Sequence, residues 1–67
     1  MNGTMRKNIE IGDYVKIVLK QNQRTGSLTD GYVKEILTKF PAHQHGIKVL
    51  LETGEIGRVK EIYKELL

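Results

Sequence analysis

The sequence predicts a small all-β domain, built as an antiparallel sandwich or small barrel. Short apolar segments alternate with polar side chains at a period of two residues, which is typical of strands with one buried face. Turn-forming residues, glycine above all, separate these segments at short intervals along the chain. No strand–helix alternation accompanies them, and this excludes a parallel α/β sheet.

The first strand is predicted over residues 14–20, directly after the turn signal Gly12-Asp13. Val15, Ile17 and Leu19 share one face of this strand, so we expect them to point into the core together. The opposite face carries lysines and Val18, and we expect it to lie outside.

A long polar loop is expected over residues 21–30, followed by a second strand over residues 31–37. The apolar side chains of this strand fall on both of its faces, and a β-bulge or strong bend would reconcile them with one core. A second loop is expected over residues 38–46, where both histidines occur.

The third strand is predicted over residues 47–51, with Val49 and Leu51 on its inner face. Gly54 can adopt the positive φ that a tight hairpin turn needs, and the fourth strand follows over residues 56–60.

Gly57, inside the fourth strand, indicates a bend or a close backbone approach. In residues 61–67, Ile62 and Leu66 are four apart, which favours a short C-terminal helical turn over an extension of the fourth strand. Residues 1–8 are polar and are predicted to be flexible, so the barrel domain is expected to cover residues 9–67.

The composition limits what the protein can be. A chain of 67 residues forms one domain with a thin core. The absence of cysteine excludes disulfides and thiolate metal sites. The 11 basic and 8 acidic residues give a net charge of +3, which is compatible with a polyanionic partner. Neither a targeting segment nor a membrane-spanning apolar run is visible, so a cytoplasmic protein is expected.

The segment order resembles SH3-like barrels of the KOW or Tudor type over roughly residues 9–60. A closer resemblance, over nearly the whole chain, is to the YwbE family. The motifs that carry it include Gln23-Arg24-Thr25-Gly26, His43-x-His45-Gly46 and Gly54-x-x-Gly57-Arg58. That family is recorded as a domain of unknown function, so the resemblance implies no activity, cofactor or catalytic residue. KOW-type barrels often bind RNA or ribosomal partners, whereas Tudor-type barrels bind peptides.

The leading functional hypothesis is nucleic-acid binding, with RNA or a ribonucleoprotein as the partner. By strand parity, lysines and an arginine point outward and could form a basic stripe that contacts phosphates. The polar loop offers a guanidinium for a phosphate, and the second loop offers a phenyl ring and imidazoles for base stacking. The candidate contact residues are Lys20, Arg24, Lys39, Phe40, His43, His45, Lys48 and Arg58.

The alternative is a protein-interaction module. A peptide could bind a groove near Tyr32 or Phe40. Self-association as a homodimer is a further option if Val18 and Leu50, which point outward by parity, are both exposed.

An enzyme is not expected, because the sequence has no nucleophile elbow, Walker-type loop or carboxylate pair in an apolar setting. No cofactor, metal or small-molecule substrate is expected. His43 and His45 are two apart, a spacing that directs them to opposite sides of an extended loop, and no third ligand is evident.

Overall fold

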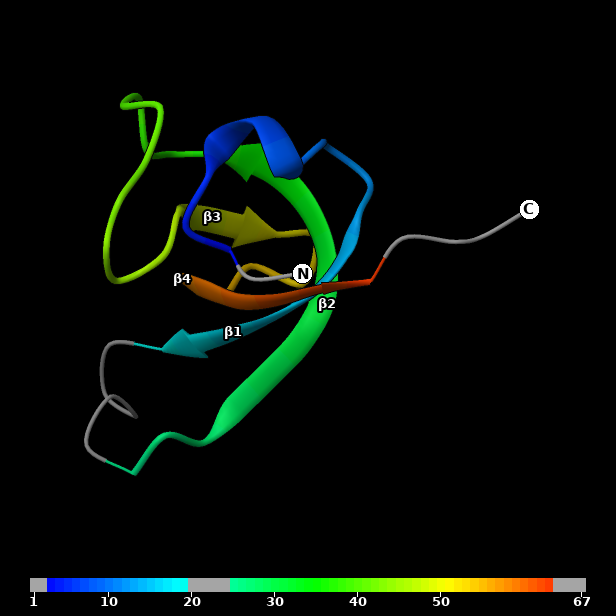
Figure 1. Cartoon of the computed structure of the whole chain (residues 1–67). Coiled ribbons are helices and arrows are strands. Elements are labelled where there is room, and N and C mark those ends of the chain that lie inside the picture. Colours follow the sequence, from blue (N-terminus) through cyan, green and yellow to red (C-terminus); the bar gives the residue numbers. More distant parts are fainter. Residues whose placement is uncertain (1–2, 20–24, 64–67) are drawn as a thin grey trace.

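Four antiparallel strands close into one barrel. The computed structural model describes residues 3–19 and 25–63. Its elements are the short 3-10 helix η1 (Arg6–Asn8) and the strands β1 (Tyr14–Leu19), β2 (Leu28–Ile36), β3 (Lys48–Leu51) and β4 (Ile56–Tyr63). Each strand pairs with the next, and β1 also pairs with β4, so the sheet closes on itself (Figure 1). The predicted all-β SH3-like barrel is therefore confirmed.

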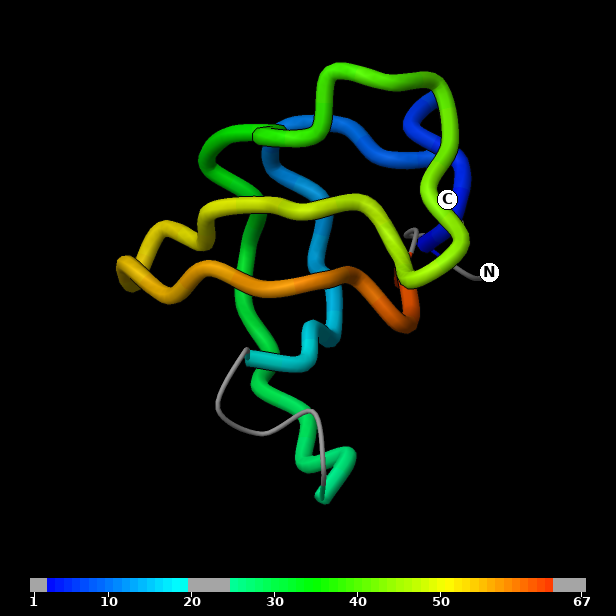
Figure 2. The backbone as a smooth tube through the Cα atoms, turned by 90° about the vertical axis from the view of Figure 1, so that its left-hand side faces the viewer, coloured from blue at the N-terminus to red at the C-terminus, as the bar shows by residue number. Residues whose placement is uncertain are grey.

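The strands form two hairpin-like pairs that cross each other. In Figure 2, β1 and β2 run together in one direction, while β3 and β4 lie across them. β4 joins the two pairs, because it is hydrogen-bonded to β3 through residues 56–58 and to β1 through residues 57–63. This crossing encloses a small core between the two pairs.

The core consists of aliphatic side chains from all four strands. Val15 and Ile17 of β1 and Val49 and Leu51 of β3 are fully buried, and Leu19 packs against them while partly exposed. This confirms the inward face predicted from the alternation. The remaining members of the core are Ile9, Val33, Ile47, Val59 and Ile62.

Val18 is outside the core cluster, as its parity predicts, but it is covered and only 5% exposed. Its β4 neighbour is Arg58, next to Gly57. A Cβ atom at Gly57 would lie 2.4 Å from the carbonyl oxygen of Val18, so the two backbones meet without room for a side chain. The close approach expected at Gly57 is confirmed. The burial of Val18 removes half of the exposed pair on which the homodimer option depended.

Strand β2 begins at Leu28, three residues earlier than predicted, and the expected loop ends correspondingly sooner. The missed residues are partly or fully exposed, so they carry no alternation of buried and exposed side chains. The expected bulge is confirmed, because the pairing with β3 shifts register between Val33 and Glu35.

Strand β4 continues to Tyr63, where the sequence favoured a helical turn. That preference rested on the four-residue spacing of Ile62 and Leu66, and Leu66 lies outside the described residues. The observed strand contains a second bulge. Lys16 pairs with Glu61 and Ile17 pairs with Val59, which leaves Lys60 as the extra residue. Val59 and Ile62 therefore both face the core although they are three apart. The remainder of the predicted turn, residues 64–67, lies outside the described residues.

The segment predicted to be flexible makes ordered contacts over residues 3–8. The N–H of Ile47 donates to the carbonyl of Gly3, and the N–H of His43 donates to the carbonyl of Thr4. Met5 forms an isolated β-bridge with Ala42. These bonds hold the loop between β2 and β3 against the N-terminal segment.

Candidate nucleic-acid interface

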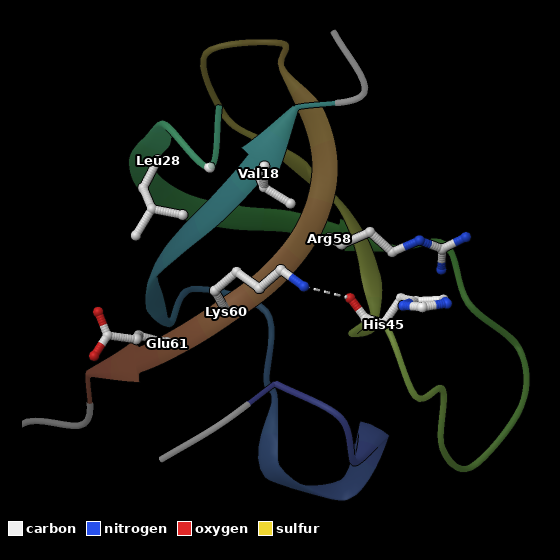
Figure 3. A pocket seen from close by; sticks show the side chains of 7 residues that line it. Val18, Leu28, His45, Arg58, Lys60 and Glu61 are labelled. Carbon is white, nitrogen blue, oxygen red and sulfur yellow. Dashed lines mark hydrogen bonds between the residues drawn. The ribbon is translucent and has the colours of Figure 1, made fainter. Parts of the chain in front are cut away.

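An open cavity of about 640 Å³ lies where the outer face of β1 and β4 meets two loops. Val18 of β1 and Leu28 of β2, which are cross-strand neighbours, form its apolar part. The other lining residues are Gly26, His45, Arg58, Lys60 and Glu61 (Figure 3). The cavity thus joins apolar surface to three groups that can carry positive charge.

Carbonyl groups of the loop before β3 accept hydrogen bonds from two basic side chains of the cavity. Arg58 donates from Nη1 to the carbonyl of Gly46 at 3.2 Å, and Lys60 donates from Nζ to the carbonyl of His45 at 3.0 Å. Figure 3 shows Lys60 reaching this loop, with Val18 and Leu28 on its other side. Gly46 has φ of 105°, and a Cβ there would lie 2.4 Å from the carbonyl oxygen of Val59. Only glycine lets the loop lie this close to β4.

The two histidines lie on the same side of the loop, contrary to the prediction. Their ring centroids are 5.8 Å apart, and Nδ1 of His43 accepts a hydrogen bond from the N–H of His45 at 3.1 Å. The turn that brings them together is closed by the N–H of Gly46, which donates to the carbonyl of His43. The extended loop assumed from the spacing is therefore wrong at this point.

Burial lowers the pKa of His43 below its usual 6.5, and the positive charges of Arg58 and His45 lower it further. His43 is consequently neutral at pH 7 and can accept hydrogen bonds or stack against a planar group. Among residues 3–19 and 25–63, no three potential ligand side chains are grouped so that they could hold a metal ion.

The candidate contact residues are only partly brought together. Lys48 and Arg58 are direct cross-strand neighbours on β3 and β4, and His45 lines the same cavity as Arg58. Lys39 and Phe40 are exposed, Phe40 by 71%, but neither lines the cavity. The predicted contacts Lys20 and Arg24 lie outside the described residues.

The expected basic stripe is interrupted. Lys16 pairs with Asp30 on one side and with Glu61 on the other, so acidic side chains flank it in both neighbouring strands. Within residues 3–19 and 25–63, the neighbouring cations of the outer face therefore lie on β3 and β4, whereas Lys16 of β1 lies between acidic neighbours.

Sequence reasoning missed a row of three tyrosines across the strands. Tyr14 pairs with Tyr32 in β2 and with Tyr63 in β4, and its ring lies 5.1 Å and 6.0 Å from theirs, centroid to centroid. Tyr32 is 55% exposed and Tyr63 is 43% exposed. Strand pairing alone aligns these residues, so no local pattern in the sequence could reveal the row.

The sequence analysis also left Lys60, Glu61 and Leu28 out of the candidate site. Lys60 faces outward by strand parity, as predicted, and the bulge turns Glu61 outward directly after it. A break in alternation between Val59 and Ile62 was the available signal, and a strand bulge would have been the better explanation of it.

The chain is similar to known sequences over nearly its whole length. Residues 2–62 match the family described as "Uncharacterized conserved protein (DUF2196)". The chain is 58% identical over 62 residues to the "Uncharacterized protein YwbE" of Bacillus subtilis (strain 168). The aligned region covers 92% of this chain and 95% of that protein. No solved structure matches the chain. Within the described residues, no helix has the length and apolarity that a membrane crossing requires.

Proposed function

The chain belongs to the YwbE family, and we propose that it binds single-stranded nucleic acid, with RNA as the favoured ligand. The observation that carries this proposal is the cavity, in which Arg58, Lys60 and His45 lie beside the apolar surface of Val18 and Leu28. Phosphates require cations, and an unpaired base requires a flat or apolar contact.

Arg58 and Lys60 are positioned to bind phosphate while keeping their bonds to the loop. A guanidinium carries five N–H donors and an ammonium carries three, and each group uses one donor on a loop carbonyl. Lys48, beside Arg58, extends the cationic surface by one strand. Neighbouring phosphates of one strand would thus meet neighbouring cations.

The dimensions and lining of the cavity favour a single strand over a duplex. A base that is paired and stacked in a duplex cannot enter a cavity, whereas a splayed base can. Val18 and Leu28 would contact its face, and the rings of His43 and His45 lie at the adjacent loop. The carboxylate of Glu61 can accept a hydrogen bond from a ribose 2′-hydroxyl, and this supports RNA over DNA.

Fluorescence anisotropy with a labelled RNA of about eight nucleotides tests the proposal. We expect Arg58→Gln to weaken binding about tenfold, because a charge-assisted phosphate contact is lost. The slope of log affinity against log salt should become shallower by about 0.7, the contribution of one single-strand phosphate.

Lys34→Gln is the matched control, because Lys34 is exposed and does not line the cavity. It removes the same charge and should change binding much less than Arg58→Gln. An affinity that does not vary with salt, or equal effects of the two substitutions, would rule out this cavity as a phosphate-binding surface.

A further inference from the structure

We propose that the tyrosine row of Tyr14, Tyr32 and Tyr63 is a second binding surface, which takes an arginine or lysine side chain of an extended protein segment. None of the three rings lines the cavity, although Glu61 borders both sites, and the proposal does not depend on nucleic-acid binding. Its evidence is the arrangement of the three rings, the carboxylates around them and one lysine of the chain itself.

The rings present aromatic surface to solvent. The two outer rings of the row, Tyr32 and Tyr63, are each about half exposed, and none of the three tyrosines lines the cavity. The faces of aromatic rings carry negative electrostatic potential and attract ammonium and guanidinium groups. A row of three such rings can therefore hold a cation and the apolar stem that carries it.

The charges around the row favour a basic partner. The hydroxyl of Tyr14 donates to Oδ2 of Asp30, and that of Tyr63 donates to Oε2 of Glu61 at 3.1 Å. The carboxylates of Asp30 and Glu61 favour a cation at the rings, although the whole chain has a net charge of +3.

Lys16 already shows how a cation can occupy the row. Its Nζ lies 5.7 Å from the centroid of the Tyr63 ring, within the range of a cation–π contact. Lys16 therefore acts as an internal competitor at Tyr63, whereas the more exposed ring of Tyr32 is accessible to a partner. Removing the charge of Lys16 should strengthen the binding of a cationic ligand and weaken that of an anionic one.

A protein segment fits this surface better than a free cation. The rings come from three adjacent strands, so the row spans about 10 Å across the sheet. Such an open row does not enclose a small ion on all sides, and an exposed cation–π contact is weak on its own. An extended segment crossing the strands could contact all three rings and place its basic side chain beside the carboxylates.

Tyrosine fluorescence provides a direct readout, because the chain has three tyrosines, all in this row, and no tryptophan. The full chain would be titrated with a glycine–serine peptide that contains two arginines. The comparison ligands are the same peptide with glutamines and free arginine amide. We expect saturable binding of the arginine peptide, and much weaker binding of both comparison ligands.

Two substitutions make the test specific to the row. We expect Tyr32→Leu to weaken peptide binding about fivefold and Lys16→Gln to strengthen it about threefold, as measured by NMR titration. Tyr32→Phe keeps the ring and should bind like the unaltered chain, which controls for folding. Unchanged binding in Tyr32→Leu, weaker binding in Lys16→Gln, or equal binding of free arginine amide would overturn the proposal.

The RNA-binding proposal and the peptide-binding proposal can be contradicted independently of each other. The RNA test depends on Arg58, whereas the peptide test depends on Tyr32. RNA binding that is lost in Tyr32→Leu, with no peptide binding at all, would assign the row to nucleic acid instead.

Discussion

At the scale of single residues, Arg58 of the cavity interacts both with the loop before β3 and with the neighbouring cation on β3. It bonds the carbonyl of Gly46, neighbours Lys48 across the strands, and lowers the pKa of His43 through its charge. Burial contributes most to that lowered pKa, and Arg58 contributes more than His45. Burial therefore has the largest effect on the protonation of His43, and the cavity side chains Arg58 and His45 add to it.

The pKa of His43 should respond to Arg58. An NMR titration of the imidazole ring is expected to give a pKa below 6.5 in the unaltered chain and a higher pKa in Arg58→Gln, because a nearby positive charge is gone. An unchanged value in Arg58→Gln would mean that the two groups do not interact in solution.

The lowered pKa of His43 also determines how its protonation changes the free energy of unfolding with pH. Between the folded and unfolded pKa values, the unfolded chain binds the proton more tightly. The stabilisation of the folded state by neutral His43 is therefore complete above pH 6.5, the pKa in the unfolded chain. It is lost as the pH falls toward and through the lower pKa of the folded chain. Urea unfolding at pH 7.5 and at pH 5 should show a smaller acid-induced loss of stability in His43→Gln than in the unaltered chain.

At the scale of elements, the bulge in β4 determines which side chains face the core and which face the ligands. Glu61 would share the inward parity of Val59 in an uninterrupted strand, but the bulge at Lys60 turns it outward. The same shift brings Ile62 inside and aligns Tyr63 with Tyr14. The shift in register at Lys60 thus places Glu61 at the cavity and aligns the ring of Tyr63 with the other two tyrosines.

Ile62→Ala tests this register. Ile62 is 4% exposed, so its truncation should reduce the free energy of unfolding by about 3 kcal/mol. Glu61→Ala should change it by less than about 0.5 kcal/mol, because Glu61 is exposed. Urea denaturation followed by circular dichroism measures both. The opposite order of effects would contradict the bulge and place Glu61 in the core.

The sequence analysis succeeded where alternation is uninterrupted and failed where the pairing shifts. β1 begins at Tyr14 as predicted, and the inward side chains of β1 and β3 were identified correctly, because the apolar residues that face the core in these strands are two apart. The end of β4 was misassigned, because the four-residue spacing of Ile62 and Leu66 fits one face of a helical turn as well as one face of a strand. The start of β2 was missed, because Leu28 to Asp30 have no buried face.

The candidate site was less predictable than the fold. The cross-strand neighbours Lys48 and Arg58 were both named, yet their adjacency depends on pairing. The positions of the histidines depend on the positive φ of Gly46, which spacing alone does not reveal. The tyrosine row combines pairings from three strands, one of them across a bulge, so only the complete barrel brings it together.

At the scale of the whole molecule, the outer face of the barrel divides into two regions of different charge. The basic cavity lies around Val18 and Arg58, whereas the tyrosine row lies at the opposite end of β1. Val18 and Tyr14 are four residues apart, which corresponds to about 13 Å along a strand. Asp30 lies between these regions, and Glu61 lies at their border, where it lines the cavity and accepts a hydrogen bond from Tyr63.

This separation predicts that the two surfaces act independently on RNA. Arg58→Gln and Tyr32→Leu would be combined, and RNA affinity would be measured for both single variants and the double variant. Tyr32→Leu should change RNA affinity by less than about twofold, and the double variant should match Arg58→Gln, because separated sites are additive within about 0.5 kcal/mol. A large loss in Tyr32→Leu alone would mean that bases stack on the tyrosines and that one strand of RNA crosses both regions. Independence would instead leave the tyrosine row available to a protein while RNA occupies the cavity.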